Sequence, residues 1–134
     1  MDLHHMNWFA VTAAAFCNFL VGGLWYSPLL FGRAWMKENG FTDEQLSKRS
    51  MGRIFGLTFL FSFVMAANLA LVLSGRNNPG YGAAYGFHAG LGWVAMSFFI
   101  IGLFEARSWR YLLIHAGYVT ISFVLMGLVL ASWV

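Results

Sequence analysis

Six residues of this sequence have side chains that can bind or react with a small molecule. Two of them, His115 and Tyr118, are three positions apart, so a helix places them on adjacent turns of one face. The histidine of such a pair can act as a base, and the neighbouring hydroxyl can donate a hydrogen bond. The full set is Trp25, Tyr26, Glu105, Arg107, His115 and Tyr118. They predict either a small polar ligand-binding pocket or an aromatic belt with an interfacial ion pair.

Three asparagines lie within otherwise apolar stretches. Asn7 and Asn18 are eleven positions apart, which returns a helix to nearly the same angle, whereas Asn68 belongs to another stretch. Polar side chains inside a bilayer face protein or water rather than acyl chains. The asparagines therefore predict either interhelical hydrogen bonds, with Asn68 as a candidate partner of Asn18, or a polar path for a small solute.

Histidine and cysteine are too sparse to predict a metal centre or a cofactor. His4 and His5 are adjacent, and His88 is predicted on the same side of the membrane, so copper or zinc binding by these three is left open. His88 and His115 are predicted at heights about 15 Å apart, so they cannot both be axial ligands of one haem. Cys17 is the single cysteine, which excludes an internal disulfide and a cysteine cluster.

The composition is that of a membrane protein. Hydrophobic residues make up 60% of the 134 residues and charged residues only 10%, whereas soluble domains carry about 25% charge. Lipid must therefore solvate much of the surface. The net charge of +3 comes from cations in short links rather than on one face, so no nucleic-acid partner is expected. We expect membrane lipids around one domain that covers residues 1–134.

Four apolar stretches are long enough to cross a bilayer as helices, which takes about 20 residues. They are residues 7–26, 53–75, 81–104 and 111–134. Strands of a membrane barrel need only about 10 residues, so this length favours helices. The predicted fold class is an all-α membrane protein with four transmembrane helices in a compact bundle.

The link over residues 27–52 is the only sizeable polar segment. Pro28 ends the first helix, because the residue before a proline is pushed out of the α region. Phe31 and Trp35 are four positions apart, as are two cations of the same segment, which predicts a short amphipathic helix at the interface. Residues 42–45 have the pattern of a capping box, and we expect the second membrane helix to begin there.

Gly82, Gly86 and Gly90 share one face of the third predicted helix. Lipid gives helices no hydrophobic reason to associate, so close approach across small residues supplies the attraction by dispersion. This face predicts close packing, either against a helix of the same chain, or at a subunit interface or pore. We expect a homo-oligomer.

The distribution of Lys and Arg predicts how the chain is oriented. Seven of these cations lie in residues 27–53 and in the link between the third and fourth stretches, and only Arg76 lies on the opposite side. Short loops rich in Lys and Arg stay in the cytoplasm. We therefore expect both termini outside, residues 27–52 inside, and the six candidate ligand-binding residues near the cytoplasmic face.

Acidic residues are absent from all four stretches. Proton-coupled carriers usually keep an acidic residue within the membrane, so this absence argues against a small proton-coupled exporter. The sequence also lacks a phosphate-binding loop, an HExxH zinc motif and a Ser-His-Asp set.

Several short motifs are spread over nearly the whole chain. They are Asn7-Trp8, Gly22 with Leu24-Trp25-Tyr26-Ser27-Pro28, Phe31-Gly32, Trp35-Met36, Glu105 with Arg107, His115-Ala116-Gly117-Tyr118, and Met126-Gly127. In these motifs the chain resembles the bacterial membrane proteins grouped as domain of unknown function family 1761. The resemblance implies a four-span bacterial integral membrane protein, and it implies no activity. We expect the protein in the inner (cytoplasmic) membrane.

Two functions follow from these observations. The first is a non-enzymatic, oligomeric module that binds or passes a small molecule or supports a membrane complex. The second is a small membrane enzyme that uses His115 on the cytoplasmic side. Loss of turnover on changing His115 would favour the enzyme, whereas loss of ligand binding or solute flux would favour the module.

Overall fold

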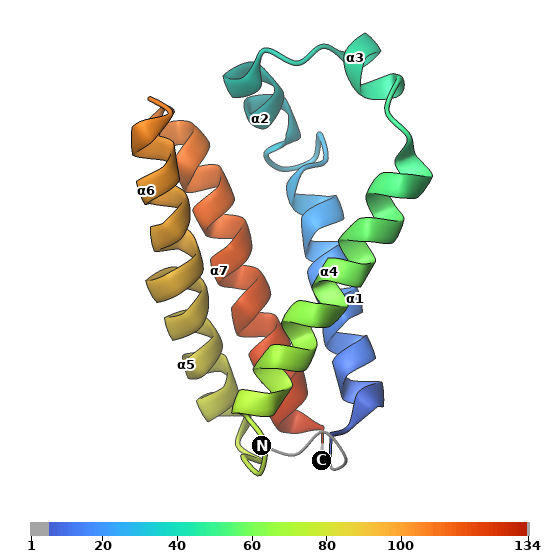
Figure 1. The fold of residues 1–134 in the computed structure, drawn as a ribbon, viewed down its shortest axis with the longest axis vertical. Coiled ribbons are helices and arrows are strands. Elements are labelled where there is room, and N and C mark those ends of the chain that lie inside the picture. The colour runs from blue at the N-terminus through green and yellow to red at the C-terminus, as the bar shows by residue number, and fades with distance from the viewer. Residues whose placement is uncertain (1–5, 134) are drawn as a thin grey trace.

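The computed structural model describes residues 6–133 and has four long helical segments (Figure 1). They are α1 (Trp8–Trp25), α4 (Met51–Val72), the combined segment Pro79–Phe104, and α7 (Trp109–Ser132). Each is long and apolar enough to cross a membrane, and each bound lies within three residues of the sequence prediction. The chain is an all-α, multi-pass membrane protein, as predicted.

The helix α7 is the centre of the bundle, with α1 on one side and the third segment on the other (Figure 1). The helix α4 packs mainly on α1 and leans away from α7 toward the end that carries α2 (Gly32–Asn39) and α3 (Asp43–Ser47). We call this the α2 end. At the opposite end, where α1 begins and α7 ends, Val11, Ala14, Ala66 and Met126 form a fully buried apolar core.

The polar link folds back onto the end of α1. Ser27 accepts the backbone N–H of Gly32 at 2.9 Å, and Trp25 accepts that of Phe31 at 2.9 Å. A Cβ on Gly32 would lie 2.5 Å from the carbonyl oxygen of Tyr26, so only glycine fits this close turn. The predicted amphipathic helix is α2, which this turn starts.

The capping box is present but does not begin the membrane helix. Thr42 and Gln45 exchange the two reciprocal hydrogen bonds that define it, as the sequence predicts. The prediction that the second membrane helix begins there is wrong, because α3 ends at Ser47 and Ser50 is extended before α4. A new N-cap at Ser50 restarts the helix at Met51.

The three-glycine face lies against α7 of the same chain. A Cβ on Gly82 would overlap the carbonyl oxygen of Gly127, and one on Gly86 would overlap that of Phe123. A Cβ on Gly90 would lie 2.9 Å from the Cβ of Phe123. Of the alternatives open from the sequence, the structure has packing within the chain, so this face is covered and is not available to another subunit.

The third segment is not a uniform α-helix. It consists of α5 (Pro79–Ala89), a wider π-helical turn η2 (Gly90–Ala95) and α6 (Met96–Phe104). A π-turn bonds residues five apart rather than four. Nothing in the apolar pattern of the sequence predicted this turn, and it changes which side chains lie above one another.

Candidate functional site

The centre of the candidate site is a hydrogen bond between the end of α1 and the first half of α7. The hydroxyl of Tyr26 lies 2.6 Å from Nδ1 of His115. Burial, and then the nearby Tyr118 and Tyr111, raise the pKa of the Tyr26 hydroxyl, so it keeps its proton. We assign Tyr26 as the donor, since a neutral imidazole has one nitrogen that accepts. The ring proton of His115 is then on Nε2.

Aromatic rings enclose the imidazole of His115. Phe98 of α6 stacks on it with ring centroids 5.6 Å apart, and Tyr111 meets it edge-on at 4.4 Å. We call Tyr26, Phe98, Tyr111 and His115 the His115 cluster. Nε2 of His115 is buried and has no hydrogen-bond partner among residues 6–133. A buried donor without an acceptor is unfavourable by about 1–3 kcal/mol. An acceptor from outside the chain that hydrogen-bonds to Nε2 would therefore be stabilising.

Trp25 fixes the end of α1 against α7. Its indole N–H donates to the carbonyl oxygen of Ile114 at 2.9 Å. Its six-membered ring lies over Gly117, where a Cβ would come within 2.7 Å of it. The glycine thus leaves room for the tryptophan, and the tryptophan sets the distance between the two helices that carry Tyr26 and His115.

A second polar network lies deeper in the bundle. The hydroxyl of Tyr118 donates to Oδ1 of Asn18 at 3.0 Å, and the amide of Asn18 donates to the hydroxyl of Ser62. Asn18 and Ser62 are only 2% and 1% exposed. We call Asn18, Ser62 and Tyr118 the Asn18 network. It joins α1, α4 and α7 through side chains that satisfy one another, as expected for polar groups that hold membrane helices together.

The two groups adjoin at their tyrosines. The rings of Tyr26 and Tyr118 meet edge-on with centroids 5.4 Å apart. Polar groups thus extend from Ser62, in the middle of α4, to His115 near the α2 end. The sequence predicted Trp25, Tyr26, His115 and Tyr118 as candidate residues, and the structure brings all four of them together.

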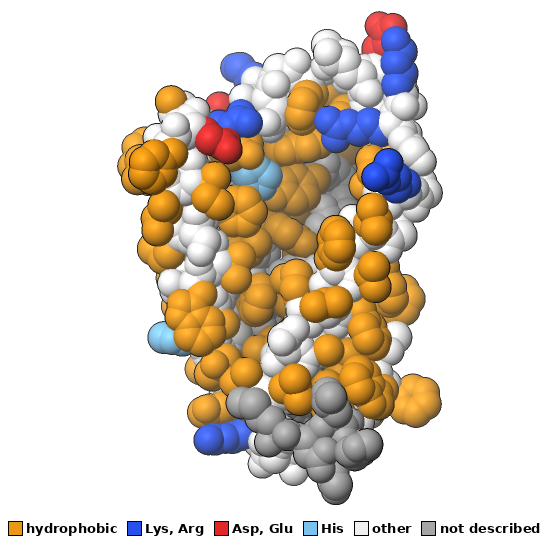
Figure 2. Space-filling view, in the orientation of Figure 1, with side chains coloured by type: hydrophobic (Ala, Val, Ile, Leu, Met, Phe, Trp, Pro, Cys, Tyr) orange, Lys and Arg blue, Asp and Glu red, His pale blue; other side chains and the backbone are white. Residues whose placement is uncertain are grey.

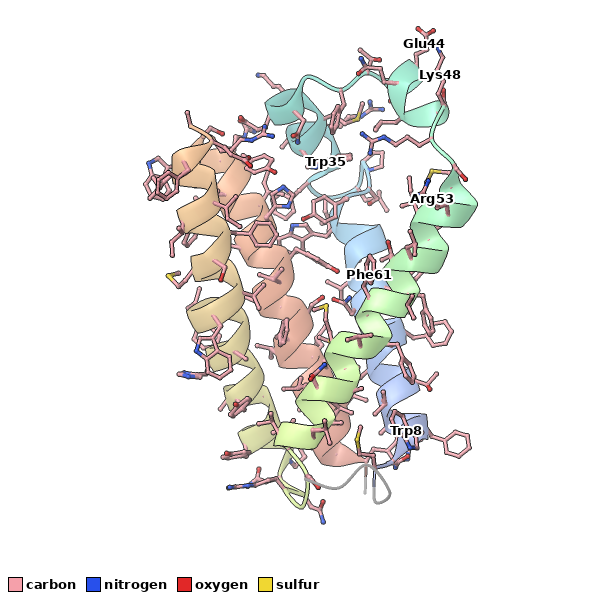
Figure 3. The ribbon with its side chains drawn as sticks, viewed as in Figure 1. Trp8, Trp35, Glu44, Lys48, Arg53 and Phe61 are labelled. Carbon is pink, nitrogen blue, oxygen red and sulfur yellow. The ribbon has the colours of Figure 1, made fainter. Side chains whose placement is uncertain are left out.

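The helix α2 packs on the outer side of the His115 cluster, at the α2 end of the bundle. Trp35 lies on the bundle side of α2 (Figure 3), and its ring meets that of Tyr26 edge-on at 5.6 Å. Glu38 accepts a hydrogen bond from the hydroxyl of Ser108 at 2.7 Å and lies 3.9 Å from the guanidinium of Arg110. These contacts attach α2 to the start of α7.

The remaining predicted charges lie at the edge of the site. The guanidinium of Arg107 lies over the ring of Tyr111, 4.5 Å from its centroid, and so adjoins the His115 cluster. Glu105 lies 3.5 Å from Arg107, but it is exposed and does not contact the cluster. Five of the six candidate residues therefore form one contiguous group, and Glu105 is attached to it only through Arg107.

The asparagines have three separate roles. Asn7 caps α1 by accepting the backbone N–H groups of Phe9 and Ala10. Asn68 is exposed and donates to the carbonyl oxygen of Val64 in its own helix. The suggested pairing of Asn68 with Asn18 is wrong, because the crossing of α1 and α4 brings Ser62 opposite Asn18 instead.

Of the histidines considered for metal binding, only His88 can be placed. It lies on α5 beside Tyr85 and Trp93, while His4 and His5 lie outside the described residues.

Sequence reasoning missed Phe98, Ser62 and Tyr111. Tyr111 is four residues before His115, so the helical spacing already contained a signal for it. Phe98 and Ser62 are on other helices, and nothing in their local sequence indicated which face would meet α7 or α1.

Figure 2 shows that one face of the molecule is hollowed between α4 and α7 toward the α2 end. The first half of α4 borders this face and leaves several apolar side chains exposed, including Ile54, Leu57 and Phe61, the last labelled in Figure 3. We call this space the α4–α7 hollow. Lys and Arg side chains lie around its upper rim (Figure 2), and Arg53 is near the start of α4 (Figure 3).

Comparison with known proteins identifies a family but no characterised relative. No curated protein and no solved structure matches the chain. A family model described as "protein of unknown function (DUF1761)" matches residues 9–131, which include all six candidate ligand-binding residues. The chain therefore belongs to this family, as its motifs predicted.

Proposed function

We propose that this protein binds an anionic amphiphile at the cytoplasmic side of the bacterial inner membrane. The acidic headgroup is held at the His115 cluster, and the acyl chain lies in the α4–α7 hollow. One observation carries the proposal: Nε2 of His115 is a buried donor without an acceptor among the described residues. A headgroup oxygen supplies the missing acceptor.

Charge favours an anionic headgroup at this end. Residues 27–53 and 105–110 contain seven Lys and Arg and four Asp and Glu, so seven minus four leaves a net charge of +3. The cations of short loops favour the cytoplasmic side, which also bears anionic lipid in the inner leaflet. We therefore infer that the α2 end faces the cytoplasm and that both chain ends face the outside.

The shape of the bundle favours a ligand with an acyl chain. The first half of α4 leaves six large apolar side chains exposed, namely Met51, Ile54, Phe55, Leu57, Leu60 and Phe61. The α4–α7 hollow opens on the face drawn in Figure 2. An acyl chain can enter from the bilayer along this side without crossing a polar surface. Aromatic walls with a few convergent polar groups are the usual lining of a ligand site.

Binding from one side is better supported than passage across the membrane. A cavity of about 160 Å³ lies at the opposite end, with Asn7 and Arg76 in its lining. Between this cavity and the Asn18 network lies the buried apolar core that contains Val11, Ala14 and Met126, all 0% exposed. A polar solute would have to cross this core without a hydrogen-bonding partner, which is unfavourable.

The enzyme alternative is less well supported by the geometry. A general base needs a ring nitrogen with a free lone pair, yet Nδ1 of His115 already accepts a hydrogen bond from Tyr26, and Nε2 carries the ring proton. Among residues 6–133, no carboxylate forms a hydrogen bond or ion pair with His115 that would orient it as a base. Binding without turnover is therefore the preferred function.

A photoactivatable phosphatidic acid with a diazirine in its acyl chain tests the proposal. It is added to the purified full-length protein in a neutral detergent, irradiated, and located by mass spectrometry of peptides. We expect labelling on α4 and α7 at the hollow. His115→Phe keeps the ring that stacks on Phe98 but removes both nitrogens, and it should lower labelling about tenfold.

Two controls make the result specific. His88→Phe makes the same change outside the site and should leave labelling unchanged, and a diacylglycerol probe without the phosphate should label weakly. Equal labelling of the wild type and His115→Phe would overturn the proposal. Conversion of the unirradiated probe by the wild type, lost in His115→Phe, would establish the enzyme instead.

A further inference from the structure

The second notable surface lies on the third helical segment, away from the glycines. Its exposed residues are Ala84, His88, Gly92 and Trp93, and Tyr85 lies at its edge, half-buried against the chain's own core. We call this surface the His88 face. His88 is two residues from both Gly86 and Gly90, which places it on the opposite side of the helix from the contact with α7. The chain's own α7 therefore cannot cover it.

The depth of His88 makes its exposure unusual. The segment Pro79–Phe104 has 26 residues, about 39 Å at 1.5 Å per residue, whereas the hydrocarbon core is about 30 Å thick. His88 lies nine residues, about 13 Å, from the start of the segment. A centred helix thus places it about 9 Å inside the hydrocarbon. Ionisable residues at such depths face protein or a polar cavity rather than lipid.

Three polar ring groups on this face have no partner in the described chain. The hydroxyl of Tyr85, the imidazole of His88 and the indole N–H of Trp93 make no hydrogen bond within residues 6–133, although the rings contact one another. The centroids of His88 and Trp93 are 5.5 Å apart, and Trp93 is 57% exposed. Trp93 follows His88 by five residues, and the wider π-turn of η2 brings residues at this spacing to the same side of the helix.

We propose that two copies of this chain associate through their His88 faces. A neutral imidazole has one donor and one acceptor, and a tyrosine hydroxyl can also serve as both. Such groups are self-complementary, which suits a two-fold interface where each residue meets its counterpart reciprocally. An acyl chain offers these rings no hydrogen bond, so a second copy satisfies them where lipid does not.

Gly92 permits the close approach that this contact needs. It is exposed, and nothing lies within 4 Å of the position where its Cβ would be. A partner helix can therefore approach the backbone beside Trp93, as small residues allow in membrane interfaces. The nearest cation along the chain, Arg76, is engaged over the ring of Tyr81 at 4.7 Å, and no acidic residue lies on this face. The His88 face therefore has no cation, at the depth of His88, that could bind a lipid phosphate.

The oligomeric state of the purified full-length protein tests the proposal, which does not depend on the proposed function. Native mass spectrometry over a dilution series in mild detergent should give a dimer for the wild type. His88→Phe keeps an aromatic ring without nitrogens and should raise the dissociation constant at least tenfold. His88→Gln restores a donor and an acceptor and should recover most of the affinity.

Matched variants separate the two sites of the protein. Ile100→Ala alters an exposed apolar side chain on the same segment and should leave the dimer intact, as should His115→Phe at the proposed ligand site. Conversely, His88→Phe should still be labelled by the photoactivatable lipid. Failure of one proposal therefore leaves the other standing.

Cysteine cross-linking locates the contact. In a Cys17→Ser background, Gly92→Cys should form a disulfide between two copies on oxidation in the membrane, whereas Leu60→Cys on α4 should not. A wild type that is monomeric at every concentration would overturn the proposal. Equal dimerisation of His88→Phe, or cross-linking at Leu60→Cys but not at Gly92→Cys, would overturn it as well.

Discussion

The close contact of α5 with α7 predicts opposite effects for the same substitution at two glycines. In Gly86→Ala, the added Cβ would lie on the carbonyl oxygen of Phe123, 2.6 Å from its carbonyl carbon and 3.0 Å from Cα of Val124. In Gly56→Ala, nothing lies within 4 Å of the added atom, and the position is exposed. The first should destabilise the bundle, and the second should not.

The magnitude follows from the geometry. Ordinary van der Waals contact of a Cβ begins at 3.4 Å, so α5 must move from α7 by roughly 1 Å in Gly86→Ala. A gap of about 0.5–1 Å loses a quarter to a half of the dispersion attraction between facing atoms, and overpacking of this kind costs about 1–3 kcal/mol. The gain of alanine over glycine within a helix is about 0.5–1 kcal/mol. We expect a net loss of about 1–2 kcal/mol at Gly86 and a gain of about 0.5–1 kcal/mol at Gly56.

Unfolding in mixed micelles with increasing dodecyl sulfate measures both changes. Far-ultraviolet circular dichroism and tryptophan fluorescence follow the helices and their packing, and each variant is compared with the wild type in one micelle composition. If Gly86→Ala and Gly56→Ala shift the midpoint in the same direction and by similar amounts, the α5–α7 contact is not as close as described.

Three further predictions use the same preparations. Asn18→Leu should destabilise the bundle by about 1–3 kcal/mol, because it removes the acceptor of the Tyr118 hydroxyl and the amide that donates to Ser62. Asn68→Leu on the exposed side of α4 should have little effect, and equal midpoints in dodecyl sulfate would contradict the Asn18 network. The raised pKa of Tyr26 means that the folded chain keeps a proton which the unfolded chain releases near pH 10.0, so stability should fall as the pH rises above that value. The fall should be smaller in Tyr26→Phe when unfolding is compared at pH 8 and pH 11, and an identical fall would show that the hydroxyl is not buried. Single cysteines in a Cys17→Ser background test the orientation: an impermeant thiol reagent applied to cells without their outer membrane should label Asn78→Cys but not Ser47→Cys, and the reverse pattern would invert the topology.

The sequence alone determined the features that depend on local pattern. Four apolar stretches of membrane length became four helical segments, since burial in lipid requires every backbone group to be paired within its own helix. The stop before Pro28 and the capping box at Thr42 also followed, because each depends on residues within one turn. Trp25, Tyr26, His115 and Tyr118 were predictable as a group, since they lie at helix ends assigned to the same side of the membrane.

Only the tertiary structure decided how these helices face one another. The sequence could not choose between Ser62 and Asn68 as the partner of Asn18, because the answer depends on the crossing of α1 and α4. It also left open whether the glycines at 82, 86 and 90 meet α7 or another subunit, and it contained no periodic signal for the π-turn beside His88. In lipid, every face of an apolar helix is compatible with its surroundings, so close packing and a few polar contacts decide which face is buried.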